Sequence, residues 1–144
     1  LGITFNYGLI LAWISATNEI SIIPILFYTG AIFWTLGYDT IYGFQDIKDD
    51  EIIGLKSTSI KFKKTPYAFL YMSYLIFFFS LIIVGYLIKF NYFFYMMLIP
   101  IFLQLFIVQI KKVNLKNSKN CLETFKSNNY LGFLVFSSLV IGKL

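Results

Sequence analysis

Long apolar segments recur along this chain and constrain its fold more than any other feature. The apolar core of a bilayer is about 30 Å thick, and about 20 residues of helix cross it. We therefore expect an all-α, polytopic transmembrane helical bundle with about five spans in a single domain, residues 1–144. The predicted spans are Gly2–Thr17, Ser21–Gly43, Pro66–Ile88, Asn91–Ile110 and Phe125–Leu144.

The composition supports a membrane environment. Hydrophobic residues make up 58% of the chain and charged residues only 13%, whereas soluble domains have about 45–50% and about 25%. A soluble domain of this length has too little interior for 17 Phe and 11 Tyr. Lipid contact removes that difficulty, and the lipid bilayer is a predicted partner of the chain.

The residues available for metal binding are mainly oxygen donors. The chain has no histidine, and its single cysteine, Cys121, excludes a disulfide within the chain. Zinc and copper sites built from thiolates and imidazoles are therefore disfavoured. A metal here would be a hard cation such as Mg²⁺ or Ca²⁺.

The lysines indicate membrane topology rather than nucleic-acid binding. All 12 basic residues are lysines, and most lie in two windows between apolar segments, Lys48–Lys64 and Lys111–Lys126. Loops rich in lysine face the cytoplasm in membrane proteins. We therefore expect both long polar loops to be cytoplasmic and no nucleic acid as a partner.

Acidic residues concentrate in the segment Tyr38–Thr58, which reads YDTIYGFQDIKDDEIIGLKST. At helical pitch Asp46 and Asp50 are one turn apart, Asp39 precedes Asp46 by two turns, and Asp49 adjoins the same stripe. Carboxylates on one face repel one another and favour a bound cation. Mg²⁺ bound by one or two carboxylates and by substrate phosphate oxygens is a common use of such a group.

Other residues of this segment agree with a phosphate ligand. Lys56 follows Gly54 near the end of the loop, where its ammonium could meet a phosphate. Ser57 and Thr58 are candidates to cap a following helix or to donate to phosphate oxygens. Acidic loops beside membranes are often only solvated surface, but Asp39 lies inside an apolar run, where an ionisable group indicates function.

The same segment resembles the second aspartate-rich motif of UbiA-type membrane prenyltransferases, whose pattern is YDxxYxxxDxxxDxxxGxKS. Upstream, LGITFNYGLILAW and FWTLGYDTIY look like the branch of that family that prenylates 4-hydroxybenzoate. The resemblance implies the fifth to ninth helices of a nine-helix enzyme. Beyond Thr65 it rests on hydropathy and spacing rather than on identity.

The resemblance implies a Mg²⁺-dependent transfer of a polyprenyl group from polyprenyl diphosphate to an aromatic acid, 4-hydroxybenzoate, in ubiquinone biosynthesis at the bacterial inner membrane. Asp46 and Asp50 carry over as the catalytic, metal-binding pair. Lys56 carries over as the motif lysine, and we infer that it contacts the diphosphate. We expect Asp39, Asp49 and Tyr42 to have supporting roles. The segment 39–65 would then be a cytoplasmic aspartate-rich motif and loop.

The chain lacks the family's first motif, NxxxDxxxD. We therefore expect a C-terminal fragment of a larger prenyltransferase that is inactive alone. A family enzyme with another acceptor is an alternative, as is a non-enzymatic transport or channel subunit. A transport path predicts acidic groups spread through the bilayer depth, whereas here they crowd one loop. A soluble isoprenoid synthase is disfavoured because most spans lack a polar face.

Overall fold

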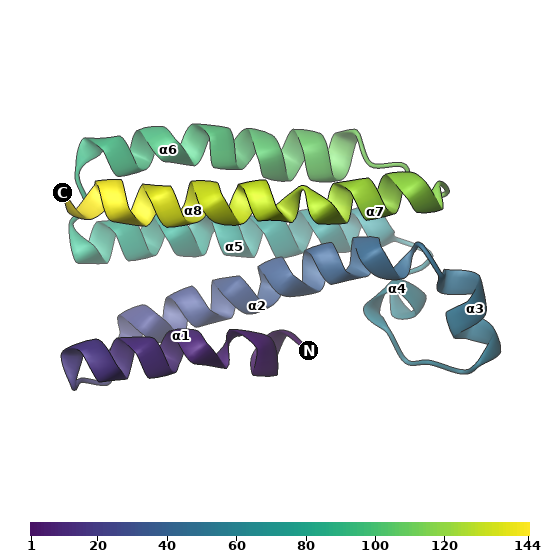
Figure 1. The fold of residues 1–144 in the computed structure, drawn as a ribbon, viewed down its shortest axis with the longest axis horizontal. Coiled ribbons are helices and arrows are strands. Elements are labelled where there is room, and N and C mark those ends of the chain that lie inside the picture. The colour runs from purple at the N-terminus through teal and green to yellow at the C-terminus, as the bar shows by residue number, and fades with distance from the viewer.

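The computed structural model describes residues 1–144 as helices joined by turns and loops, without strands (Figure 1). The long helices are α1 (Gly2–Thr17), α2 (Ile22–Gly43), α5 (Pro66–Ile88), α6 (Tyr92–Leu103), which continues into the π-helix η1 (Gln104–Lys111), and α8 (Asn128–Lys143). The short helices are α3 (Ile47–Ile52), α4 (Thr58–Lys61) and α7 (Ser118–Lys126). The predicted all-α class is confirmed.

Three helices are long and apolar enough to cross a membrane by themselves: Ile22–Gly43, Pro66–Ile88 and Tyr92–Lys111. These correspond to three of the five predicted spans. The helices α1 and α8 have 16 residues each. At 1.5 Å per residue they reach about 24 Å, which is less than the thickness of a typical bilayer core.

Local sequence signals fix the ends of α5 and α6. Pro66 occupies the first turn of α5, where its missing N–H costs no hydrogen bond. Lys89 ends α5 in the left-handed conformation, with φ of 58°. The side chain of Asn91 then caps α6 by accepting a hydrogen bond from the backbone N–H of Phe94 at 3.3 Å. This tight turn makes α5 and α6 antiparallel neighbours.

The core forms where α2 crosses α5 at small residues. Gly30 lies against the Ser80 side chain, and Gly37 lies against the ring of Tyr74. A Cβ atom at either glycine would overlap these neighbours, so the close approach of the two helices requires glycine. Tyr74 is fully buried at this crossing.

The two long connections lie at one end of the molecule, and the tight turns lie at the other. In Figure 1 the connection that contains α3 and α4 and the loop before α7 both lie on the right. The Ser118 hydroxyl joins them, because it donates a hydrogen bond to the Gln45 carbonyl oxygen at 2.6 Å. This arrangement agrees with the prediction that both long loops share one side of the membrane.

The predicted final span, Phe125–Leu144, is divided in the structure, and this prediction is corrected. Ser127 separates α7 from α8. At this break, side chains donate hydrogen bonds to backbone carbonyls. Ser127 Oγ donates to the Thr124 carbonyl at 2.7 Å, and Asn128 Nδ2 donates to the Phe125 carbonyl at 3.0 Å. Such local bonds compete with the regular helix ladder.

A buried polar network crosses the bundle beside this joint. Gln109 of η1 accepts a hydrogen bond from the Tyr74 hydroxyl and donates to Asn128 Oδ1 at 2.7 Å. The indole N–H of Trp34 donates to the same Asn128 oxygen at 3.0 Å. The network links α2, α5, η1 and α8, and it satisfies polar groups that burial would otherwise destabilise.

Candidate functional site

The aspartate-rich segment is bent rather than continuous. The helix α2 ends at Gly43, and α3 begins only after Asp46, which is its N-cap residue. Asp39 therefore lies on a different helix from Asp46 and Asp50. The prediction that these carboxylates share one helical stripe is wrong, because the turn at residues 44–46 interrupts the helical register.

Asp46 and Asp50 remain one helical turn apart, with Asp46 at the N-cap of α3 and Asp50 inside the helix. The backbone N–H of Asp50 donates to the Asp46 carbonyl at 3.0 Å. The segment after α3 then turns at Gly54, whose φ of 71° lies in the region that favours glycine. This turn leads the chain from α3 to Lys56 and α4.

The helix α4 attaches to the end of α2 through hydroxyl groups. Ser57 caps α4 by accepting from the backbone N–H of Ile60 at 3.3 Å, as predicted for a capping residue. The Thr40 and Thr58 hydroxyls are 2.6 Å apart. Ser59 is buried against Gly43. A Cβ atom at position 43 would overlap the Ser59 hydroxyl. The loop is therefore anchored directly beside the motif.

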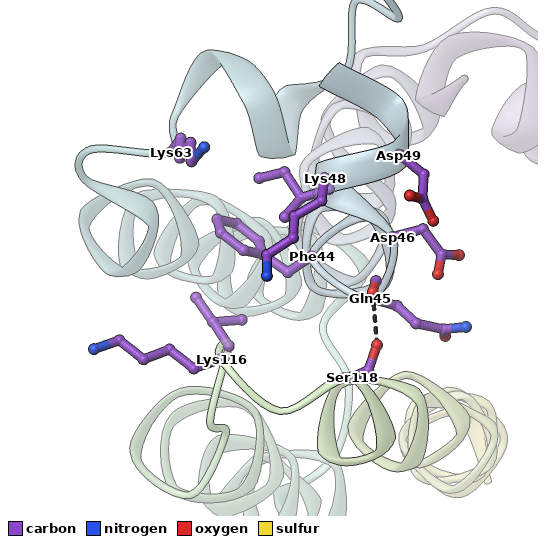
Figure 2. A pocket seen from close by; sticks show the side chains of 10 residues that line it. Phe44, Gln45, Asp46, Lys48, Asp49, Lys63, Lys116 and Ser118 are labelled. Atoms are coloured by element: carbon purple, nitrogen blue, oxygen red, sulfur yellow. Dashed lines mark hydrogen bonds between the residues drawn. The ribbon is translucent and has the colours of Figure 1, made fainter. Parts of the chain in front are cut away.

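An open cleft of about 660 Å³ lies between α3 and the loop before α7 (Figure 2). Figure 2 shows the carboxylates of Asp46 and Asp49 together on one side of the view. The side chains of Lys63 and Lys116 lie on the other side, and Lys48 lies between the two groups. The cleft lining is completed by Phe44, Gln45, Ile47, Leu115 and Ser118.

The structure distributes the other predicted site residues around this cleft. Asp50 is partly buried on α3 and does not line the cleft. Lys56 lines a separate depression of about 370 Å³ next to α4. Asp39 is partly buried on α2. The ring of Tyr42 packs against Phe125 of α7, with ring centroids 4.8 Å apart.

The donor atoms of the cleft suit Mg²⁺ but do not form a complete metal cage. No three His, Cys, Asp or Glu side chains come together anywhere in the chain. The cleft does hold two carboxylates, and the side-chain oxygen of Gln45 beside them is buried without a hydrogen-bond partner. Mg²⁺ is commonly bound by one or two carboxylates while it keeps waters and phosphate oxygens as ligands. The residues present therefore fit this cation.

The lysines of the cleft differ in their partners. Lys63 forms an ion pair with Glu51, with Nζ and Oε2 2.7 Å apart, which links α3 to the segment before α5. Lys48 and Lys116 are exposed on the cleft lining. Sequence reasoning missed these three lysines because it assigned loop lysines to topology. Lys48 lies within the motif. Lys116 is far from the motif in sequence, so no local spacing predicts that it lines the same cleft.

Sequence comparison places this chain in a known family. The chain belongs to the UbiA prenyltransferase family, whose sequence profile matches residues 1–137. The combination of an all-helical apolar fold with an aspartate-rich loop at one end agrees with that membership, and the protein is an integral membrane protein.

Curated relatives of this chain include proteins named 4-hydroxybenzoate octaprenyltransferase. The relative from Francisella tularensis subsp. novicida (strain U112) is 32% identical over 145 residues, which cover 98% of this chain and 49% of the relative. The relative from Marinobacter nauticus is 30% identical over 141 residues and is covered to 48%. The chain thus spans about half the length of the curated relatives it matches. No solved structure matches it.

Proposed function

We propose that this chain forms the C-terminal half of a membrane prenyltransferase that transfers a polyprenyl group from polyprenyl diphosphate to 4-hydroxybenzoate in ubiquinone biosynthesis. The observation that carries the proposal is the cleft at one end of an apolar bundle, where Asp46 and Asp49 share the lining with Lys48, Lys63 and Lys116. Family membership and the names of the relatives support the same activity.

In the proposed enzyme, Asp46 binds the metal together with Asp50, which is one helical turn further along α3 and outside the cleft lining. Lys56 contacts the diphosphate from the neighbouring depression beside α4. Asp39, Asp49 and Tyr42 support them. Gln45 adds a neutral oxygen donor beside Asp46. Bound Mg²⁺ neutralises the negative charge that develops on the leaving diphosphate.

The reaction breaks the bond between the allylic carbon and the diphosphate oxygen. The allylic cation then forms a carbon–carbon bond with the electron-rich ring of the acceptor, and the ring carbon loses its proton. Lysine ammoniums stabilise the diphosphate as it gains charge. This half of the proposed enzyme has no histidine, so among the groups it offers the proton acceptor is the departing diphosphate or an aspartate.

The proposed metal pair can be tested in a fusion of this chain with the N-terminal half of the Francisella relative. Asp46→Asn and Asp50→Asn keep the side-chain shape but remove the negative charge. We expect each to lower the formation of prenylated 4-hydroxybenzoate by about a hundredfold or more, because transition-state charge is no longer balanced. Product formation in membranes with matched protein amounts is the measurement.

Glu19→Gln is the matched control, because Glu19 lies in the tight turn after α1, away from the cleft. Mn²⁺ binding measured by electron paramagnetic resonance gives a second readout, and it should weaken only in the aspartate variants. Full turnover in both aspartate variants would show that the metal assignment is wrong. The chain alone should be inactive, and measurable turnover without the N-terminal half would contradict that part of the proposal.

A further inference from the structure

The loop of residues 112–117, which enters the cleft, is held in place by its own side chains. Val113 and Leu115 are buried in the core cluster. The backbone N–H of Asn114 donates to Asn120 Oδ1 at 2.7 Å, and the N–H of Lys116 donates to Asn114 Oδ1 at 3.1 Å. The position of the Lys116 backbone is therefore fixed by the fold, although its side chain is exposed.

This loop is also attached at both of its ends, to the turn before α3 and to α5. Ser118 Oγ donates to the carbonyl oxygen of Gln45, the residue before Asp46, at 2.6 Å. From α5, the Tyr67 hydroxyl donates to the Val113 carbonyl at 3.2 Å. Both bonds place Lys116 on the cleft that contains the motif carboxylates.

The charges around the cleft are separated. In Figure 2 the carboxylates of Asp46 and Asp49 lie on one side, Lys48 lies in the middle, and Lys116 lies on the far side. The third lysine, Lys63, already has Glu51 as its partner. A ligand that fills this space needs a divalent cation toward the carboxylates and anionic oxygens toward the ammoniums. A diphosphate bound to Mg²⁺ has both.

We propose that Lys116, together with Lys48, contacts the diphosphate in this cleft, so that the loop between η1 and α7 contributes to substrate binding. This inference rests on the proposed function. It adds a lysine from outside the aspartate-rich segment, and it gives Lys116 a role beyond membrane topology. The ammonium of Lys116 meets phosphate oxygens on the side of the diphosphate that is remote from the carboxylates.

Binding of inorganic diphosphate tests this role. The fusion of this chain with the N-terminal half of the Francisella relative, in lipid nanodiscs, is titrated with inorganic diphosphate in the presence of Mg²⁺ and followed by isothermal calorimetry. Lys116→Gln and Lys48→Gln should each raise the dissociation constant about threefold, and the double variant about tenfold, as expected for exposed charge contacts. The affinity of the double variant should also depend less steeply on salt concentration.

Lys119→Gln is the matched control, because Lys119 is exposed close to Lys116 but does not line the cleft. It makes the same change in net charge and should leave binding unchanged. Equal losses in Lys119→Gln and Lys116→Gln would overturn the inference, because they would show a general effect of charge. Unchanged binding in the double variant would overturn it as well, while the proposed function stands. Absence of diphosphate binding by the unsubstituted fusion would overturn both.

Discussion

At the scale of single residues, the structure separates charged groups that the sequence places together. Asp49 and Asp46 share the cleft, whereas Asp50 lies outside its lining and Asp39 belongs to another helix. The buried Gln45 oxygen beside Asp46 has no partner within the chain. A buried acceptor without a partner costs free energy, and a cation or its water would relieve that cost.

Cys121 provides a residue-scale prediction. Its side chain is fully buried on α7, and burial raises the pKa of the thiol. Because the thiolate is the reactive form, the folded protein should react with maleimide at pH 7 at least about tenfold more slowly than an exposed cysteine. Lys119→Cys combined with Cys121→Ser supplies that exposed reference. Equal labelling rates for the two proteins would show that α7 does not protect Cys121.

At the scale of elements, helix ends with local signals could be predicted from the sequence. Pro66 marks the start of α5 and Ser57 caps α4, because each acts on its immediate neighbours. The break at Ser127 could not be predicted from the sequence, because the apolar pattern continues across it. One of the hydrogen bonds at the break also comes from another helix: Gln104 Nε2 donates to Ser127 Oγ at 3.0 Å. Lys116 was missed for the same reason, because only tertiary structure brings its loop to the motif.

The crossing of α2 and α5 gives an element-scale prediction. Gly37→Ala places a methyl group against the buried ring of Tyr74. Overpacking of this kind should lower the free energy of unfolding by about 1–3 kcal/mol. Unfolding of the purified protein in mixed detergent micelles, titrated with sodium dodecyl sulfate, measures the change.

Gly8→Ala is the control for that substitution. Nothing lies within 4 Å of a Cβ atom at Gly8, which is inside α1. Alanine there should be neutral or stabilising by up to about 1 kcal/mol, because it favours the helix. A similar loss of stability in both variants would show that close packing at Gly37 is not the cause.

At the scale of the whole molecule, hydropathy and lysine distribution were sufficient to predict the helical class and the shared end of the two long loops. Both patterns reflect constraints that the bilayer imposes on every span: an apolar helix inside the membrane and lysine-rich loops on one side of it. We propose that this end faces the cytoplasm. The cleft could not be predicted at this scale, because its shape depends on hydrogen bonds between the two loops.

Cysteine labelling of intact cells tests this orientation. In a Cys121→Ser background, Glu19→Cys and Lys89→Cys should react with a membrane-impermeant maleimide, because they lie in the tight turns between helices. Lys64→Cys and Lys119→Cys, in the two long loops, should react only after permeabilisation. Labelling of Lys64→Cys and Lys119→Cys from opposite sides would contradict the fold.

The hydrogen bond between Ser118 and Gln45 has a consequence for how the protein is made. Synthesis proceeds from the N-terminus, so the carboxylates of α3 leave the ribosome well before the loop that carries Lys116. A nascent chain that ends at α6 has only one wall of the cleft. The site is completed late in translation, when the last pair of helices joins the bundle and secures the loop to the motif.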